Sequence, residues 1–475
     1  MAALDVIIIG GGLAGSCLAN GIINKAKDPV NVTIYERDER DSGRDGYQIR
    51  LGSYALIGLR ACLTQCQYTN LLLCFGRSGG VVSSAPAIFD PDMKLVLDLS
   101  KFPVYQKSAP IGRARLRNLL QEPLLKQNVI RHSKTFLKYE VIKPEGVPNS
   151  KIRVYFSDGA NADCDILISA EGSGSRINKQ LGCNNIVDPP KTDSGGVLGK
   201  CHVSRSVLRD LPRGLVEKGT IYTAGQGCKL FAALYLPDSM TSRQEKASSQ
   251  PAVDKGEPSH YDEAEASLMV AFGWDGGLSP REVVKLADPK GYMRQQMAEA
   301  KWHPELMKLI DAMAPEALQA VSSRQAKDTP VDWRRRTRAD KVDLPNPEIA
   351  HPRVWLMGDS FHPMLPTRGM GANNALRDTA DILDPLLELA RHKKARGLVT
   401  DEEARTQLAI YEKAMIPRAM AWVKTSAQQT LPDLDTTRGK IIVLGVRLLL
   451  VVVGAVLQVA RRLGWEPHDE APELP

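Results

Sequence analysis

LDVIIIGGGLAGSCLANGII, residues 4–23, joins a short apolar run to a glycine-rich turn and a helical pattern. The apolar run at 4–9 predicts a buried strand, and the residues after the glycines predict a helix. A second run, VNVTIYER at 30–37, predicts another strand that ends in an acid. Strand, turn, helix and strand in this order predict the opening of a doubly wound parallel sheet. Because the apolar run leads directly into the turn, we expect a strand of the fold here rather than a cleaved signal peptide.

The glycines of this turn, Gly10, Gly12 and Gly15, have a spacing that suits a nucleotide pyrophosphate. The first allows a tight turn, the second lets the backbone approach the phosphates, and the third lets helix and strand pack closely. Free N–H groups at the start of the helix attract the phosphates. Glu36 follows 21 residues after Gly15 and can accept hydrogen bonds from ribose hydroxyls. The pattern predicts a dinucleotide site without separating NAD from FAD, and its alternative is a glycine turn that binds no ligand.

The chain has 475 residues, of which 43% are hydrophobic and 25% charged, a globular profile with room for two or three domains. Its net charge of +7 is spread out, and the densest cluster, Arg334–Arg336 with Arg338, is typical of a solvated face. No zinc-finger spacing or aromatic and basic platform supports nucleic-acid binding. Eight scattered cysteines without a CxxC pair indicate a reduced, intracellular protein. The sequence has no metal-ligand spacing, HExxH or GxSxG, so we expect no metal centre.

A second candidate for the nucleotide site lies at 353–374, RVWLMGDSFHPMLPTRGMGANN. Its first part predicts a strand that ends at Asp359, a position where ligands bind in open α/β sheets. Gly371 and Ala372 let the backbone approach a flat ligand, and a helix that begins near Asn373 would direct its positive end toward that ligand. One site built from residues 10–36 and 359–373 requires an inserted second domain between its halves.

Short apolar runs such as KLVLDL, KLFAALYL and SLMVAFGW, in residues 81–105 and 197–275, predict an antiparallel sheet. We therefore predict an α/β fold in which a Rossmann-like domain is interrupted by an α+β domain and followed by C-terminal helices. Helical patterns dominate 281–327, and the paucity of apolar residues at 237–265 predicts a flexible loop. The predicted parts are 1–80, 109–185 and 341–395 for the nucleotide domain, 81–108 and 186–340 for the inserted domain, and 396–430 for a helical segment.

Residues 441–460, IIVLGVRLLLVVVGAVLQVA, contain fourteen Leu, Ile or Val residues. Twenty helical residues span about 30 Å, the thickness of a bilayer core. Arg447 opposes insertion by roughly 2.5–3.5 kcal/mol, whereas each large aliphatic residue contributes about −0.3 to −0.6 kcal/mol. The segment fits a transmembrane helix with the rest of the chain facing the cytosol, and it also fits a buried or interfacial helix that covers the rest of the chain.

Three motifs together resemble the single-component FAD-dependent monooxygenases, the family of p-hydroxybenzoate hydroxylase. They are GGGLAG with Glu36, CDILISAEGSGSR at 164–176, and GDSFHPMLPTRGMGANNAL at 358–376. Arg113, in IGRARLRNLL, is similar to an arginine that the family uses against FAD, and YEKAMIPRA at 411–419 resembles a C-terminal helix of the same enzymes. The motifs occur in the family's order over residues 1–425. RGMGANNAL and the apolar tail are closer in character to fungal secondary-metabolite members.

The resemblance implies FAD bound without a covalent link by Gly10, Gly12, Gly15, Glu36, Arg113, Asp359, Gly371, Ala372 and Asn373. NADPH or NADH would reduce the flavin, and O2 would then form a C4a-hydroperoxide that hydroxylates or epoxidises a small lipophilic aromatic or polyene metabolite. The middle motif departs from the family at two positions. Glu171 stands in place of an aspartate and Asn178 in place of an arginine, so we expect altered nicotinamide binding.

The motifs identify no catalytic side chain. His362 could relay a proton or order its loop, and Arg368 could steer a substrate or form a structural salt bridge. Tyr222, Tyr235 and Trp274 could line a substrate pocket, although core packing explains any one of them better. An FAD monooxygenase is the leading hypothesis. An FAD reductase or dehydrogenase without oxygen insertion and a non-catalytic binding protein of the same fold are the alternatives.

Overall fold

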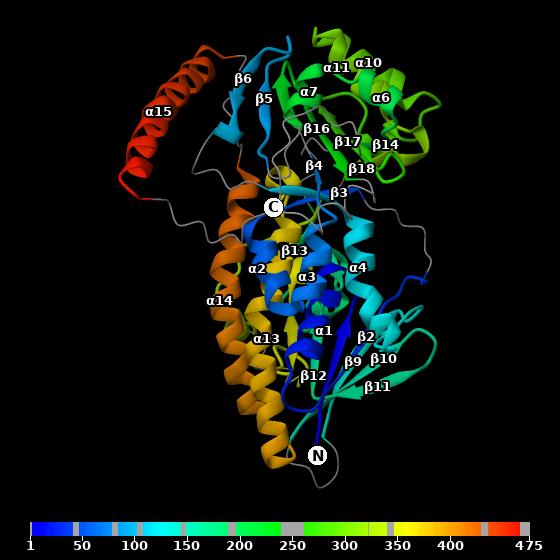
Figure 1. Cartoon of the computed structure of the whole chain (residues 1–475). Coiled ribbons are helices and arrows are strands. Elements are labelled where there is room, and N and C mark those ends of the chain that lie inside the picture. The colour runs from blue at the N-terminus through cyan, green and yellow to red at the C-terminus, as the bar shows by residue number, and fades with distance from the viewer. Residues whose placement is uncertain are drawn as a thin grey trace.

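The protein is described by a computed structural model that covers residues 2–40, 47–77, 84–101, 108–143, 149–188, 196–238, 261–321, 323–339, 346–428 and 436–465. It combines a parallel sheet, antiparallel sheets and long C-terminal helices (Figure 1). The mixed α/β fold class that the sequence predicts is thereby confirmed. The residue-level boundaries of the domains stay predictions.

The parallel sheet lies in the lower half of the molecule in Figure 1. Its order, within the described residues, is β20 (Val354–Leu356), β12 (Ile166–Ser169), β1 (Leu4–Ile9), β2 (Val30–Tyr35) and β8 (Ile130–Arg131). Ile9 is in register with Tyr35 and with Ser169, and Ser169 is in register with Leu356. The carboxyl ends of these four strands therefore lie side by side at one edge of the sheet.

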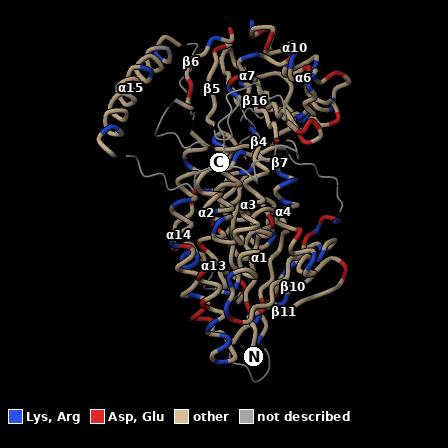
Figure 2. Tube along the Cα trace, in the orientation of Figure 1, with Lys and Arg blue, Asp and Glu red and all other residues tan. Residues whose placement is uncertain are grey.

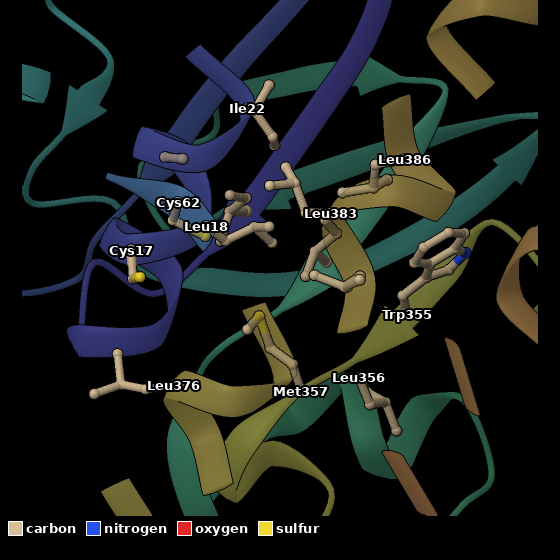
Figure 3. Close-up of a cluster of buried hydrophobic side chains, with 14 of the residues drawn as sticks. Cys17, Leu18, Ile22, Cys62, Trp355, Leu356, Met357, Leu376, Leu383 and Leu386 are labelled. Atoms are coloured by element: carbon tan, nitrogen blue, oxygen red, sulfur yellow. The ribbon is translucent and has the colours of Figure 1, made fainter. Parts of the chain in front are cut away.

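One face of the parallel sheet is covered by helices α1 (Leu13–Lys25), α2 (Ser53–Cys62) and α13 (Gly371–Arg396), with α14 (Asp401–Ala427) packed on α13 (Figure 1). Leu376, Leu383 and Leu386 recur at helical spacing on α13 and point into the core that Figure 3 shows, where Leu18 and Ile22 of α1 meet them. Packing is close because small residues stand at the contacts: a Cβ at Gly58 of α2 would lie 1.8 Å from the Leu376 carbonyl oxygen.

Smaller elements surround this unit. A three-stranded antiparallel sheet lies beside it, and two-stranded pairs connect its loops. These elements are β9 (Phe136–Ile142), β10 (Lys151–Phe156), β11 (Asn161–Cys164), the pairs β3 (Gln48–Leu51) with β7 (Ala109–Gly112) and β13 (Ile186–Val187) with β19 (Gln325–Ala326), and the helices α3 (Gln65–Leu72), α4 (Arg113–Lys126), α5 (Arg176–Gln180) and α12 (Trp333–Ala339).

An eight-stranded, mostly antiparallel sheet forms the upper part of Figure 1. Its described strands are β18 (Gln319–Val321), β14 (Gly196–His202), β17 (Ser267–Trp274), β16 (Cys228–Pro237), β15 (Thr220–Gly225), β5 (Ala87–Phe89) and β6 (Leu95–Asp98), with β4 (Gly76–Arg77) beside β16. Burial alternates along β17, where Leu268, Val270 and Phe272 are buried and Met269 and Ala271 are half-buried. The buried face packs in one core with residues of α6 (Arg205–Asp210), α7 (Arg213–Lys218), α9 (Pro280–Val283), α10 (Pro289–Glu299) and α11 (Pro304–Ala312).

Two sequence expectations differ from this architecture. The helical assignment of 281–327 is correct only as far as Ala312, because β18 extends the open edge of the large sheet beside β14 and β19 pairs with β13. A short apolar run cannot be told from a helical turn by periodicity alone. Residues 239–260 of the predicted loop 237–265 lie outside the described residues, and Asp238 and Tyr261 on either side of them form an isolated bridge.

Helix α15 (Thr437–Arg462) stands apart from the other long helices and runs beside β5 and β6 (Figure 1). Few of its residues are charged (Figure 2). Leu448 and Val451 are 62% and 72% exposed. The Arg447 guanidinium donates to the carbonyl oxygens of Leu95 and Val96, at 2.8 and 2.6 Å. This helix therefore contacts the edge strand β6 through a charged group while its apolar side chains face outward.

Candidate active site

The glycine loop after β1 is shaped by the absence of side chains. Gly10 has a φ of +108°, and a Cβ there would lie 2.4 Å from the Ala170 carbonyl oxygen. A Cβ at Gly15 would lie 2.2 Å from the carbonyl oxygen of Gly10. At Gly12, by contrast, no atom of the described chain lies within 4 Å of that position. Gly10 and Gly15 are thus required for packing, whereas Gly12 leaves the backbone open to the approach of another group.

Glu36 and Gln121 both hold the glycine loop in place through hydrogen bonds to the Gly11 backbone. The Gly11 N–H donates to Glu36 Oε2 at 2.6 Å, and the Asp38 N–H donates to Oε1 at 3.0 Å. Gln121 Nε2 and Ser16 Oγ both donate to the Gly11 carbonyl oxygen, at 2.6 and 3.1 Å. Each carboxylate oxygen of Glu36 has a second lone pair. The residue can therefore hold the loop and still accept a hydrogen bond from a hydroxyl.

The turn Gly358–His362 follows β20 at the same sheet edge. Gly358 has a φ of +58°, and its N–H donates to Asp378 Oδ2 at 2.7 Å. Ser360 Oγ donates to the Ser169 carbonyl oxygen at 2.8 Å and so joins the turn to β12. Asp359 is exposed, whereas the four other residues of the turn are buried. The turn thus presents one carboxylate from an otherwise closed backbone segment.

Asp378, two turns into α13, is the centre of a buried polar cluster. It is 0% exposed, and besides Gly358 it accepts hydrogen bonds from His362 Nε2 at 2.7 Å and Arg418 Nη2 at 2.6 Å. Burial alone would raise the pKa of Asp378, but the charges and hydrogen bonds of His362 and Arg418 outweigh it and hold the pKa below its usual value. The His362 side chain is therefore committed to an acid in the protein interior.

Asn178 and Asn185 hold the turn from its other side. Asn178 Nδ2 donates to the Ser360 carbonyl oxygen and to Asn185 Oδ1, both at 2.9 Å. Asn185 Nδ2 donates to the Phe361 carbonyl oxygen at 2.8 Å and to Thr329 Oγ1 at 3.0 Å. Asn178 is 1% exposed. Asn178, where the family pattern has an arginine, is therefore a buried structural residue that forms an amide pair with Asn185.

Glu171, the other departure, makes local contacts. Its carboxylate accepts hydrogen bonds from the hydroxyls of Ser169 and Ser175, at 3.0 and 2.7 Å, and from the Ile177 N–H at 3.1 Å. Ile177 lies in the first turn of α5, where unpaired N–H groups favour a negative charge. The longer side chain therefore caps a short helix next to the sheet edge.

Three of the predicted binding residues come together near Asp359. Arg113 begins α4, and its positive charge opposes the rise in the pKa of Asp359 that surrounding protein atoms cause, even though the Asp359 side chain is exposed. Gly371 begins α13, and a Cβ on it would lie 3.9 Å from Asp359 Oδ1. Ala372, next to it, is half-buried. Neither α1 nor α13 has a side-chain hydrogen bond at its N-cap, which leaves N–H groups at both helix starts for another partner.

Asn373 and Arg368 have other partners. Asn373 is buried, accepts a hydrogen bond from the Gly52 N–H at 2.7 Å and donates to the Arg50 carbonyl oxygen at 2.9 Å. Its amide therefore ties α13 to the segment after β3. Arg368 is exposed and donates from Nε to the Thr425 carbonyl oxygen at 3.0 Å. A hydrogen bond to the end of α14 thus takes the place of the salt bridge suggested by the sequence.

The aromatic residues of the large sheet divide into two groups. Tyr235 is buried and donates to the Cys74 carbonyl oxygen at 3.0 Å, and Trp274 is buried and donates to the Leu278 carbonyl oxygen at 3.0 Å. Both side chains are buried, Trp274 in the core beneath the large sheet and Tyr235 on the opposite face of that sheet. Tyr222 is half-buried and lies on the face opposite the buried core.

Sequence reasoning missed Asp378, Asn185, Gln121 and the role of Arg418. An acid on the otherwise apolar face of α13 was the available signal for Asp378, because charged residues are almost never fully buried without a partner. Arg418 lies within the quoted motif YEKAMIPRA. Nothing in the sequence indicates which acid it pairs with.

Comparisons with known proteins agree with this geometry. Residues 287–413 match the FAD binding domain family. The chain is 24% identical over 471 residues to the dual O-methyltransferase/FAD-dependent monooxygenase elcB of Phaeosphaeria nodorum, covering 91% of this chain and 47% of that protein. It is 23% identical over 439 residues to the FAD-dependent monooxygenase sor5 of Hypocrea jecorina, covering 89% and 83%.

The chain thus spans about half the length of the Phaeosphaeria protein. A solved structure, a proposed FAD-containing monooxygenase of Photorhabdus luminescens, shares the fold with a TM-score of 0.62 at 21% identity, covering 90% of this chain and all of that one. The matched domain, the curated relatives and the shared fold agree with one another: residues 287–413 match the FAD binding domain family, and the chain as a whole is similar to FAD-dependent monooxygenases.

Proposed function

We propose that this chain is an FAD-dependent monooxygenase that uses NADPH or NADH and O2 to hydroxylate or epoxidise a lipophilic aromatic or polyene metabolite, in secondary metabolism. The observation that carries the proposal is the register of the parallel sheet. Ile9, Tyr35, Ser169 and Leu356 end their strands in one row, so all three sequence motifs and Glu36 meet at one edge. Ligands bind at this edge in open α/β sheets.

The residues at this edge fit FAD. The open backbone at Gly12 and the uncapped start of α1 suit a pyrophosphate, and Glu36 keeps acceptor capacity for a ribose. Asp359 would accept hydrogen bonds from the ribityl chain, with Arg113 nearby as a positive charge. Gly371 and Ala372, at the start of α13, would lie along the isoalloxazine and stabilise negative charge on it. Asn373 would contribute to the site indirectly, because its amide oxygen accepts a hydrogen bond from the Gly52 N–H and so fixes that backbone segment.

Bound FAD would supply the redox chemistry of the reaction, because no side chain can react with a nicotinamide cofactor and with O2 in this way. The protein then has to orient the flavin, exclude water and position the substrate. We assign no proton transfer to His362, because its Nε2 donates to the buried Asp378.

A half-buried apolar face of the large sheet supports a lipophilic substrate. Leu198, Ala271, Phe231 and Tyr222 are in register across four strands and are all half-buried. Tyr235 lies on the same face, and its ring comes within 3.8 Å of a Cβ position at Gly112, the residue before Arg113. This face is therefore turned toward the proposed cofactor site. Apolar contacts favour binding in proportion to the buried area.

The visible spectrum tests the cofactor, and oxygen incorporation tests the reaction. We expect a yellow protein whose NADPH oxidation in air accelerates with a suitable lipophilic substrate and whose product gains one atom of ¹⁸O from ¹⁸O2. A protein that takes up no FAD would refute the proposal. Oxidation of NADPH without oxygen in the product would instead select a reductase or dehydrogenase.

Asp359→Ala tests the assignment of the cofactor site. We expect this variant to lose flavin during gel filtration, because the ribityl chain loses an acceptor, while its unfolding temperature without FAD stays close to that of the wild type. Asp384→Ala is the matched control, since Asp384 is an exposed acid on α13. Equal flavin content in the two variants would contradict the assignment.

We also propose that α15 attaches the enzyme to a membrane inside the cell, with the catalytic part facing the cytosol. Residues 437–460 are long and apolar enough to cross a bilayer, with a mean hydropathy of 2.6 and none of the apolar window buried. Basic residues, Arg438 and Arg462, stand near both ends. Arg447, however, holds the helix against β6, which favours a position in the plane of the interface over a span perpendicular to it.

Two measurements separate these arrangements. Flotation with vesicles of anionic lipid tests binding, and a version that ends before Thr437 should not float. Protease protection of a tag after residue 475 tests the orientation, because an in-plane helix leaves the tag on the outside with the catalytic part. A protected tag would indicate a span, and absence of the full chain from the floating fraction would refute membrane attachment.

A further inference from the structure

We infer that Asp378 is a positioning residue for the turn Gly358–His362, and that Arg418 holds Asp378 in the orientation that this role requires. The inference rests on the proposed function, because Asp359 is assigned to FAD only there. Asp378 and Arg418 would act through the turn and through the start of α13 rather than by touching the cofactor.

The turn Gly358–His362 holds the backbone of Asp359 rigidly. Ser360, Phe361 and His362 are all 0% exposed. The N–H groups of Phe361 and His362 both donate to the Gly358 carbonyl oxygen, at 3.0 and 2.9 Å. The turn is thus a closed unit, and the position of the Asp359 carboxylate follows from the position of Gly358.

Asp378 is the hydrogen-bond partner of Gly358. The Gly358 N–H donates to Asp378 Oδ2, which also accepts from His362 Nε2, while Asp378 Oδ1 accepts from Arg418. Three donors, two from the turn and one from α14, converge on one carboxylate. A carboxylate accepts at both oxygens, whereas an asparagine would place an NH2 group against one of the donors. The arrangement therefore requires an ionised acid at this position.

Arg418 of α14 donates hydrogen bonds to three residues of α13. Its Nη1 donates to Asn374 Oδ1 at 2.7 Å, and its Nη2 donates both to Asp378 and to Asp381 Oδ2, the latter at 2.9 Å. The planar fork of an arginine can serve these acceptors together, whereas a lysine reaches them only as a point charge. One side chain of α14 thus fixes three residues on the first turns of α13.

Together these contacts join the two parts of the site that would face the flavin. Gly371 and Asp378 lie on the same helix, and Asp378 holds the turn that carries Asp359. The distance between the start of α13 and the Asp359 carboxylate is therefore set by Asp378. The side-chain hydrogen bonds of the glycine loop at 10–15 run instead to Glu36, Gln121 and Ser16.

This separation provides a readout that general loss of structure would not give. FAD uses both halves of the site, whereas ADP is expected to use only Gly12, Gly15 and Glu36. In Asp378→Asn and Arg418→Met of the full chain, we expect FAD to bind about 10- to 100-fold more weakly, as loss of one or two charge-assisted hydrogen bonds produces. The inhibition constant of ADP against FAD rebinding should change by less than about twofold.

Two further variants complete the experiment. Arg418→Lys keeps the charge and should recover part of the FAD affinity, and it remains a test where a more severe variant does not fold. Arg377→Gln is the matched control: Arg377 pairs with Asp381 on the same helix, at 3.3 Å, and should leave FAD binding unchanged. FAD dissociation is followed by the recovery of flavin fluorescence, with thermal unfolding measured on the same samples.

Unchanged FAD affinity in Asp378→Asn and Arg418→Met would overturn the inference, and so would an equal loss of FAD and ADP affinity. Asp359→Ala in the same assay keeps the two proposals distinguishable. If Asp359→Ala also retains FAD, the proposed cofactor site is wrong. If it loses FAD while the Asp378 and Arg418 variants retain it, only the positioning role fails.

Discussion

The glycine loop at 10–15 and the turn at 358–362 lie at the same sheet edge, but they are specified in opposite ways. The loop depends on side chains that are missing, because a Cβ at Gly10 or Gly15 would overlap a carbonyl oxygen. The turn depends on buried side chains that are present, Asp378 and Asn178 among them. A glycine pattern can therefore be recognised from the local sequence, whereas polar partners from distant segments cannot.

The loop should therefore be the more sensitive of the two to an added methyl group. We expect Gly15→Ala to lower the free energy of unfolding by on the order of 3 kcal/mol or to prevent folding, because its Cβ would lie 2.2 Å from the Gly10 oxygen. Gly12→Ala is the control, since no described atom is near and the φ of −69° suits alanine. It should keep its unfolding temperature and lose FAD affinity. Similar unfolding temperatures for the two variants would break the comparison.

The segment that leads into the turn should be sensitive to acid. Burial, with help from Arg353, Arg338 and Arg334, lowers the pKa of His351 to about 4 although Asp401 opposes the shift. The unfolded chain has a histidine pKa of about 6.5, so the unfolded state binds more protons between these values. The stability that neutral His351 contributes is complete above about pH 6.5 and is lost as the pH falls toward 4, about 3 kcal/mol in all.

Chemical denaturation between pH 7 and 4.5 measures this dependence. His351→Gln should flatten the curve in that range, whereas His202→Gln should not, because His202 is exposed. A wild-type curve that is already flat would show that His351 titrates normally.

The amide pair gives a smaller expected effect. Asn178→Ala removes the donor to the Ser360 carbonyl oxygen and leaves Asn185 Oδ1 without that hydrogen bond. We expect a loss of about 1–3 kcal/mol in the free energy of unfolding, the cost of an unsatisfied buried polar group. Asn31→Ala serves as the control, because its hydrogen bond to Asp5 is exposed. Denaturant midpoints compare the two, and equal midpoints would argue against buried support of the turn.

The smallest effect is expected at Arg368. This exposed side chain donates one hydrogen bond to a backbone carbonyl of α14, so Arg368→Gln should change stability by no more than about 0.5 kcal/mol. Flavin content should also be unchanged. A substrate KM that rises several-fold while kcat and stability stay constant would show that Arg368 steers the substrate. An unchanged KM would leave it as a surface contact.

Much of the fold could be predicted because its signals are local. Helix α14 lies within the predicted helical segment 396–430, and the capping box of Thr400 and Glu403 marks its start. The strand 4–9 and the glycine turn are equally local. The strand order could not be predicted, because nothing in RVWLM indicates that β20 pairs with β12 rather than with another strand. For the same reason the sequence pattern predicts a helical region where β18 and β19 lie.

The parts of the candidate site that depend on glycines and on the ends of strands and helices could be predicted from the sequence. The positions of Asp359 and Gly371 follow from the strand and helix ends on either side of them. The partners of Asn373 did not follow, because a polar residue at a helix start can face either a ligand or a neighbouring backbone, and here it binds Gly52 and Arg50. The Asp378–Arg418 pair depends on how two helices cross, which no local pattern encodes.

The late position of Arg418 in the chain has a consequence for synthesis. At about 5–20 residues per second, the ribosome reaches Arg418 roughly 20–80 s after it has made the glycine loop. Asp378 is made only 40 residues before Arg418, so it lacks its counter-charge for about 2–8 s, and a buried carboxylate without a partner is costly. For most of its translation the nascent chain carries the glycine loop without the second half of the site, and until residue 356 is made the strands of the parallel sheet lack their edge partner β20. Slowing translation before residue 418 should lengthen the time for which a chaperone can bind this surface.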